Sequence, residues 1–280
     1  MNGKMLKEKL IKTMFFLCAL SSIAIVFFIV IFMLSIGYPI ILEWFAYGFA
    51  GILGSLFGSL YVAFGGTLLG VAIGIPCAIY LSEFSNMKIR NMIKPTLEVL
   101  NGFPSVILGL LGYTLICTQL SRFGIYGTQG CTLVGWIVIG IMSLPLIASV
   151  SEDSIRAVPH DLKEASLGLG ATKWQTTVNV LIPRAMPGIL TAVLLAFANG
   201  IGETMAVIMV IGNVQPPPIT LDPFKATNTI TSLIAFGYQE VTTADKQYAV
   251  LFAAGILLFI VTALTNVAIR AITKRSSSKQ

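Results

Sequence analysis

The chain has 280 residues, of which 56% are hydrophobic and 11% are charged. A soluble domain usually carries about 25% charged residues, so the composition excludes an ordinary soluble protein and indicates an integral membrane protein. A net charge of +6 is also typical of nucleic-acid-binding proteins, but here the basic residues border apolar stretches and lie in short loops. Membrane topology explains them, and we expect no nucleic-acid partner.

Six long apolar stretches follow one another along the chain, one of them interrupted only by Glu203. A stretch of about 18 or more apolar residues predicts a membrane-spanning helix surrounded by lipid. We therefore expect an all-α, polytopic bundle with spans at 13–41, 55–82, 100–120, 129–150, 187–211 and 248–272. The transmembrane domain then covers 13–272, with polar tails at 1–12 and 273–280 and a long cytoplasmic loop at 151–186.

The basic residues set the expected orientation, because Lys and Arg collect in cytoplasmic segments. With the N-terminus inside, only Arg122, Lys225 and Lys246 of the 18 Lys and Arg residues fall in outer segments. We therefore expect a multi-pass protein of the cell membrane with both termini cytoplasmic. The first span is much longer than the apolar core of a cleavable signal peptide, about 7 to 15 residues, so we expect it to remain as an anchor.

Glycine and proline mark features of the second, third and fourth spans. Proline removes a backbone donor and clashes one turn back, so Pro76, Pro104 and Pro145 should bend or start helices, with a local break around Asn101. Small-residue spacing lets helix backbones approach closely, and we favour close packing over a functional role for the glycines of the second span. These are Gly54, Gly58, Gly65, Gly66, Gly70 and Gly74.

The cytoplasmic loop at 151–186 carries the signals of two short helices. Pro159 suits a first helical turn, where its missing donor costs nothing. Apolar residues then recur at three- and four-residue spacing, and Gly168 and Gly170 should end this first helix.

The second short helix of the loop should begin with a capping box formed by Thr172 and Gln175. We expect it to end where Pro183 and Pro187 turn the chain back into the membrane. Periodicity favours two interpretations equally: a docking surface for a protein partner, and a helix pair that lies against its own bundle.

The fifth span contains Glu203 within the stretch GIGETMAV at 200–207. Charged residues at membrane depth are rare and usually face a partner or a water-filled path. Three roles are open: lining a path or pairing with another chain, donating a hydrogen bond as a protonated acid, or bonding to Asn199 or Thr204. We favour the first.

The outer segment at 212–247 contains Gln215 followed by three prolines. Consecutive prolines favour an extended, stiff backbone. The segment suits a plug or rim over an external opening and a surface loop without function equally well.

The cytoplasmic loop also resembles the motif shared by permease subunits of ATP-binding-cassette (ABC) importers: E-A-A, three residues, G, nine residues, then I-x-L-P. The matching residues are Glu164, Ala165 and Ser166, then Gly170, then Val180, Ile182 and Pro183. The resemblance implies the six-span type I importer permease fold, with residues 159–183 as the coupling element that sits on an ATPase subunit. Mg-ATP is then bound by that separate ATPase dimer, and this chain needs no cofactor; its sequence has no Walker A pattern.

Three further stretches are similar to the permeases of the Pst phosphate importers, and to the PstC-like rather than the PstA-like partner. They are GETMAV at 202–207, IYLSEFS at 79–85 and NGFPSVILGLLGY at 101–113. The similarity implies inorganic phosphate as the solute, a PstA-like second permease, a PstB-like ATPase dimer and an external PstS-like binding protein. Importers of tungstate, molybdate, sulfate or phosphonate share the cytoplasmic motif and are the alternatives.

One departure from the Pst pattern concerns the pathway. Permeases of this branch typically carry arginine four residues before the glutamate, where this chain has Asn199. An arginine fork matches an oxyanion, whereas an amide adds no charge. We expect Glu203, Asn199 and Thr204 to line the path, with the charged partner of Glu203 supplied by the second permease.

Two other classes of membrane protein fit the sequence less well. An intramembrane enzyme needs paired acids, a Ser-His or Ser-Lys set, or metal ligands within the spans. The spans offer one acid, and the single histidine, His160, lies in the cytoplasmic loop. We therefore predict no catalytic residue and no metal site. A scaffold or assembly protein would not require the motif spacing between 164 and 183.

Overall fold

The computed structural model describes residues 2–47, 49–122, 130–215, 217–240 and 246–277. Within these ranges the chain is almost entirely helical, and the only β-contact is an isolated bridge between Gly212 and Thr227. Six segments of the described chain are long and apolar enough to cross a membrane, which confirms the expected number. They are Lys7–Gly37, Ile52–Phe84, Ser105–Arg122, Thr132–Arg156, Lys173–Gly202 and Val250–Thr273.

The helical elements have the following order along the chain. The first half holds α1 (Asn2–Tyr47), α2 (Phe49–Ile79), the π-helical turn η1 (Tyr80–Phe84), α3 (Met87–Asn101), α4 (Ser105–Leu111), η2 (Gly112–Cys117) and α5 (Thr118–Arg122). The second half holds α6 (Thr132–Arg156), α7 (His160–Gly168), α8 (Lys173–Thr176), η3 (Thr177–Leu181), α9 (Ile182–Gly202), α10 (Met205–Val210), α11 (Ile230–Glu240) and α12 (Lys246–Ser277).

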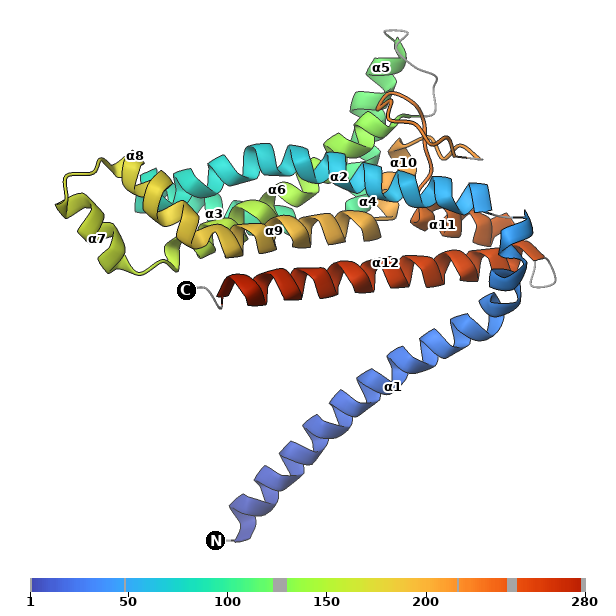
Figure 1. Ribbon diagram of the computed structural model, residues 1–280, viewed down its shortest axis with the longest axis horizontal. Coiled ribbons are helices and arrows are strands. Elements are labelled where there is room, and N and C mark those ends of the chain that lie inside the picture. The colour runs from blue at the N-terminus through green and yellow to red at the C-terminus, as the bar shows by residue number, and fades with distance from the viewer. Residues whose placement is uncertain (1, 48, 123–129, 216, 241–245, 278–280) are drawn as a thin grey trace.

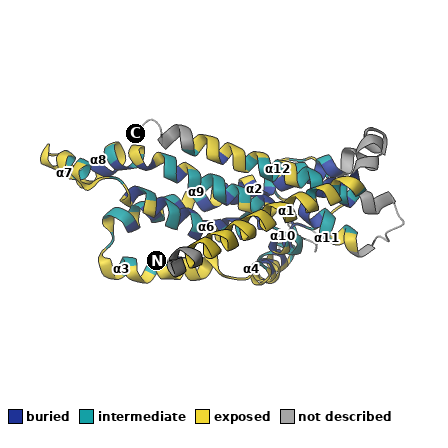
Figure 2. Ribbon diagram, turned by 90° about the horizontal axis from the view of Figure 1, so that it is seen from below, coloured by how far each residue is buried: buried dark blue, intermediate teal, exposed yellow. Residues whose placement is uncertain are grey.

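Four long helices form the body of the molecule. Figure 1 shows α2, α6, α9 and α12 running along the long axis, with α7 and α8 projecting at one end and α10 and α11 near the other. Helix α1 packs on α12 near one end and then diverges, and its described side chains are exposed over most of their length (Figure 2).

Glycines bring α2 against α6. A Cβ atom at Gly65 would lie closer than 3.0 Å to the Trp136 ring, and one at Gly66 would lie equally close to Ile139. The Trp136 indole also donates a hydrogen bond to the Tyr61 carbonyl at 3.1 Å. The expected close packing is confirmed, because no larger side chain fits without separating the two helices.

The glycines near the start of α2 allow a second close contact, with the segment that contains Pro217 and Asn228. A Cβ atom at Gly54 would collide with Pro217, and one at Gly58 would collide with the Asn228 carbonyl. The outer segment therefore lies directly against α2, and Pro217 and Asn228 are buried there.

The third span has the break expected around Asn101, because α3 ends at that residue and Pro104 caps the start of α4. Pro76 and Pro145 instead lie inside α2 and α6. Helix α3 itself was not expected. Its charged N-terminal half falls outside any apolar stretch, so hydropathy gave no signal for it.

A buried carboxylate holds α3 on α6. Glu152 is 1% exposed and accepts hydrogen bonds from Arg90 Nε and Lys94 Nζ, both at 2.8 Å. Arg156 Nε lies 3.7 Å from the same carboxylate, and Lys94 also pairs with the exposed Asp153. Burial alone lowers the pKa of Lys94, but the hydrogen bonds and charges of Asp153 and Glu152 outweigh it and raise that pKa.

The cluster predicts a large loss of stability for Glu152→Ala. The change leaves Arg90 and Lys94 without their buried partner, which should cost about 3 to 5 kcal/mol. Thermal unfolding of the purified protein in detergent measures the loss. The control Asp153→Ala removes an exposed partner of the same lysine and should cost about 1 kcal/mol or less. Equal losses in the two variants would contradict a buried electrostatic anchor at Glu152.

Candidate functional site

The chain breaks at Glu203, so the expectation of one continuous fifth helix over 187–211 is wrong. Helix α9 ends at Gly202, and Glu203 has extended backbone angles of φ −68° and ψ 129°. Its carboxylate Oε1 accepts a hydrogen bond from the Ala206 amide at 3.2 Å, at the start of α10. Glycine at 200 and 202 weakens the end of α9, and an acidic side chain satisfies a free donor of the next helix.

The break is braced by distant parts of the chain. The Glu203 carbonyl, which has no partner within α9, accepts a hydrogen bond from Thr231 Oγ1 at 2.9 Å. Thr231 lies at the start of α11, where the Ile230 amide donates to Ser59 Oγ of α2 at 2.9 Å. These two contacts tie the broken span to α2 and to the outer segment.

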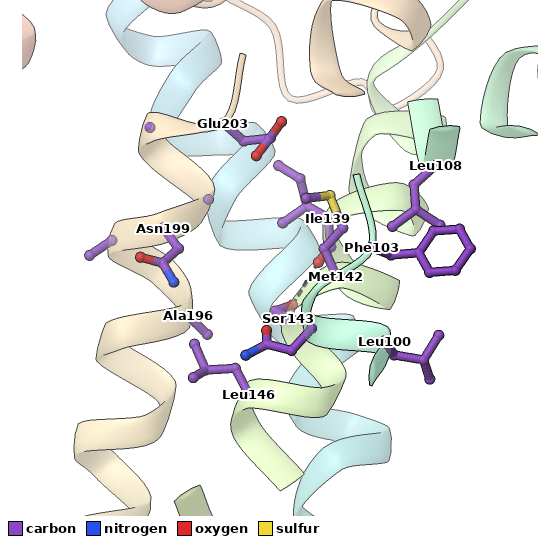
Figure 3. A pocket seen from close by; sticks show the side chains of 14 residues that line it. Leu100, Phe103, Leu108, Ile139, Met142, Ser143, Leu146, Ala196, Asn199 and Glu203 are labelled. Atoms are coloured by element: carbon purple, nitrogen blue, oxygen red, sulfur yellow. Dashed lines mark hydrogen bonds between the residues drawn. The ribbon is translucent and has the colours of Figure 1, made fainter. Parts of the chain in front are cut away.

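A cavity of about 460 Å³ lies beside the break, between the end of α9 and the middle of α6 (Figure 3). Glu203 and Asn199 project from α9 on the same side and face α6 across the cavity. Asn101 and Ser143 are the other polar side chains of its wall. Among the described residues that line the cavity, none is Lys, Arg or His. The lining residues are Leu100, Asn101, Phe103, Leu108, Ile139, Met142, Ser143, Leu146, Ala196, Ala198, Asn199, Gly200, Gly202 and Glu203.

The structure brings together two of the three expected pathway residues. Glu203 and Asn199 both line the cavity, whereas Thr204 is not among the lining residues and its hydroxyl donates to the Gly202 carbonyl at 3.3 Å. The Ser143 hydroxyl donates to the Ile139 carbonyl at 2.7 Å. Sequence reasoning missed Asn101 and Ser143, because the cavity forms only when α3, α6 and α9 meet.

The loop at 151–186 has the first helix and the capping box that the sequence predicts. Helix α7 begins after Pro159 and ends at Gly168. Thr172 Oγ1 accepts from the Gln175 amide at 3.3 Å, and the Gln175 side chain accepts from the Thr172 amide at 2.8 Å.

Gly170 occupies the position that ends α7. Its φ is +83°, a left-handed conformation that favours glycine. Its amide donates to the Leu167 carbonyl at 3.0 Å, and the next amide, of Ala171, donates to Ser166 at 3.2 Å. These paired bonds are the Schellman pattern, which satisfies the last carbonyls of a helix.

The second helix of the loop does not end at Pro183, contrary to expectation. Helical structure continues from Lys173 to Gly202. The π-helical turn η3 precedes Pro183, with the Ile182 amide bonded to the Thr177 carbonyl. Because Pro183 falls in the first turn of α9 after this wider turn, its missing donor does not interrupt the helix.

The other motif residues have different surroundings. Ser166 Oγ lies 2.9 Å from Thr176 Oγ1 and joins α7 to α8. Glu164 is exposed and approaches His160 at 3.1 Å, and Ala165 is also exposed. Val180 and Ile182 are partly buried.

The loop contacts η1, which directly follows the C-terminal end of α2. Lys163 Nζ lies 2.6 Å from Glu83 Oε2, which is in η1. Lys173 lies 5.2 Å from the centre of the Phe84 ring, and Trp174 lies 6.2 Å from it, ring centre to ring centre. The loop therefore packs on its own bundle through η1, and sequence reasoning missed this attachment because Glu83 is distant in the chain.

The loop also presents an apolar surface outward. Leu169 is 90% exposed, and Trp174 and Leu167 are 59% and 41% exposed. Exposed apolar groups clustered at a turn are typical of a protein docking site. The contacts with η1 show that the loop lies against its own bundle. Docking of a protein partner on the exposed residues stays a prediction.

The part of the chain that the structure describes holds no group of three or more His, Cys, Asp or Glu residues that could bind a metal ion. Six spans, a helical loop with an exposed apolar turn, and a polar cavity beside a broken helix are features that a multi-pass membrane permease would have.

Comparisons with known proteins identify the family. Residues 66–278 match the family described as binding-protein-dependent transport system inner membrane component, and the chain belongs to this family. It is therefore a multi-pass permease subunit of an ABC importer.

Curated relatives cover most of the chain. It is 36% identical to the probable ABC transporter permease protein YqgH of Bacillus subtilis, over 80% of this chain and 72% of that protein. It is 34% identical to the phosphate transport system permease protein PstC of Mesorhizobium japonicum, over 76% and 70%. It is 32% identical to PstA 1 of Mycobacterium tuberculosis, over 78% and 69%.

Solved structures share the fold. A bacterial alginate ABC transporter aligns with a TM-score of 0.65 over 95% of this chain and 96% of that chain, at 16% identity. The MetNI methionine transporter aligns with a TM-score of 0.60 over 78% and 93%, at 20% identity. The fold is that of type I ABC importer permeases.

Gly170→Leu should leave the protein in the membrane but separate ATP hydrolysis from uptake. The positive φ costs a branched residue about 1 to 2 kcal/mol, so the turn between α7 and α8 should distort. Uptake and ATP hydrolysis measured together in proteoliposomes test this. The control Gly168→Leu adds the same side chain in equally open space without a positive φ. Coupled uptake in the Gly170 variant would count against a coupling role for this turn.

Proposed function

We propose that this chain is a PstC-like permease subunit of an ATP-driven importer of inorganic phosphate. The similarity to PstC over 76% of this chain carries the proposal, and the similarity to PstA 1 supports the same solute. The cavity beside Glu203, at about 460 Å³, has room for an oxyanion with some of its water.

The proposed assembly has three partners. A PstA-like second permease completes the path, as the similarity to the Pst permeases suggests. A PstB-like ATPase dimer docks on the loop at 159–183, where Leu169 and Trp174 are exposed, and binds the Mg-ATP. A PstS-like binding protein delivers phosphate at the outer segment.

Within the loop, we assign the coupling of ATP hydrolysis to transport to the motif residues. Gly170 and Ser166 shape the turn that the ATPase would contact, and Glu164 and Ala165 lie on its exposed side. Val180, Ile182 and Pro183 connect that turn to α9.

The proposed orientation places the loop and both termini in the cytoplasm. In Figure 1 the N-terminal end of α1 and the C-terminal end of α12 lie toward the end of the molecule that carries α7 and α8. The distribution of Lys and Arg supports the same side.

We assign Glu203 and Asn199 to the translocation path, with Thr204 shaping the break beside them. The cavity has no basic lining residue among those described. Weak binding suits a path, because a solute must leave as readily as it enters.

Uptake of labelled oxyanions tests the proposed solute. The chain, its ATPase, the second permease and the binding protein from the same operon are reconstituted together in proteoliposomes. ATP-dependent uptake of phosphate is expected. Uptake of sulfate, molybdate, tungstate or a phosphonate, without uptake of phosphate, would overturn the assignment.

Glu203→Gln should lower phosphate uptake about tenfold while the complex still assembles, because a charged acceptor is lost from the cavity. Uptake per assembled complex is the measurement. Glu98→Gln is the matched control, since Glu98 is an exposed carboxylate of α3 and does not line the cavity. Unchanged uptake in the Glu203 variant would remove it from the path.

A further inference from the structure

The charge of the polar residues that line the cavity does not match the charge of the proposed solute. An ionised carboxylate repels an anion, yet Glu203 lines the cavity of a proposed anion path, and no basic residue lines it among those described. Electrostatic attraction of the solute therefore cannot explain the carboxylate. A carboxylate is, however, a strong acceptor for a hydrogen bond from an O–H group.

The two oxygens of Glu203 have different surroundings. Oε1 accepts from the Ala206 amide at 3.2 Å, which fixes the orientation of the side chain. The other oxygen has no hydrogen-bond partner among the described residues. Figure 3 shows the carboxylate reaching from α9 toward the side chains of α6. One acceptor site is thus held in place and left open to the cavity.

The remaining polar groups of the cavity supply donors. Asn199 lies one helical turn before Glu203, and Asn101 enters from the end of α3. Neither side chain has a hydrogen-bond partner among the described residues, and each amide offers two N–H donors. The cavity therefore combines several neutral donors with one charged acceptor.

Oxyanions differ in their need for such an acceptor. At neutral pH inorganic phosphate keeps at least one proton and has an O–H group to donate. Sulfate, molybdate and tungstate have none. The same carboxylate that accepts a short, charge-assisted hydrogen bond from phosphate faces only unprotonated oxygens in the other three, and repels them.

Building on the proposed function, we propose that Glu203 determines specificity by accepting a hydrogen bond from the hydroxyl of a protonated oxyanion, while the amides of Asn199 and Asn101 donate to its other oxygens. The permease thereby adds its own selection to that of the external binding protein. The rival arrangement is an arginine of the second permease bound to the free oxygen, which would favour any oxyanion.

A thiol in the cavity tests this proposal without the external binding protein. Leu100 lines the cavity and is 41% exposed. Leu100→Cys is introduced into the assembled transporter after Cys18, Cys77, Cys117 and Cys131 are replaced by alanine, and the alkylation rate of its thiol is measured. Phosphate bound in the cavity should slow alkylation.

The comparison uses anions of matched shape. Phosphate and arsenate carry an O–H group at neutral pH. Sulfate and monofluorophosphate do not, and monofluorophosphate has fluorine in place of the hydroxyl of hydrogen phosphate at the same charge. Half-protection should need about tenfold more sulfate or monofluorophosphate than phosphate.

The preference for phosphate over sulfate and monofluorophosphate should disappear in Glu203→Ser, because serine offers no charged acceptor. Serine can still cap α10, so the break should keep its structure. Glu203→Gln is the second variant if the first fails to assemble, and Glu98→Gln should keep the full preference. Equal protection by sulfate and phosphate with Glu203 present, a preference that persists without it, or no protection by any oxyanion would each overturn the proposal. Phosphate uptake in the complete transporter tests the proposed function separately.

Discussion

The close approach of α2 to α6 is the constraint on which the rest of the structure depends. Lipid tails are as apolar as leucine, so helices in a bilayer associate through tight packing rather than through burial of apolar surface. Gly65 and Gly66 allow Trp136 and Ile139 to lie directly on the α2 backbone. This contact sets the distance of α6 from α2, and α6 forms one wall of the cavity.

Two parts of the candidate site are attached to this pair. The loop at 159–183 contacts η1, directly after α2, through Lys163 with Glu83 and Lys173 with the Phe84 ring. The break at Glu203 is tied to α2 through Thr231 and Ser59. If the loop moves, these contacts predict that α2 and the break beside the cavity move with it.

The sequence predicted features that depend on neighbours in the chain. Five charge-free stretches and a sixth interrupted only by Glu203 predicted the six spans, and the spacing of Thr172 and Gln175 predicted the capping box. It did not predict the break at Glu203, since an apolar stretch contains no signal for a carbonyl that Thr231 satisfies from a distant helix. The prediction that a helix ends at Pro183 was wrong for a related reason, because a π-helical turn accommodates this proline. The ion pairs of Glu152 and the position of Asn101 in the cavity wall depend on contacts between separate helices, which the sequence does not show.

The contacts of the loop at 159–183 with η1 predict that the loop and α2 stay together as one rigid body. Spin labels at Leu169, on the exposed turn, and at Leu68, exposed on α2, report it through pulsed electron spin resonance in the assembled transporter. The account predicts the same distance distribution between the two labels in the nucleotide-free and ATP-trapped states. A shift of that distribution on ATP trapping would contradict it, because the loop would then move independently of the helix that positions the cavity.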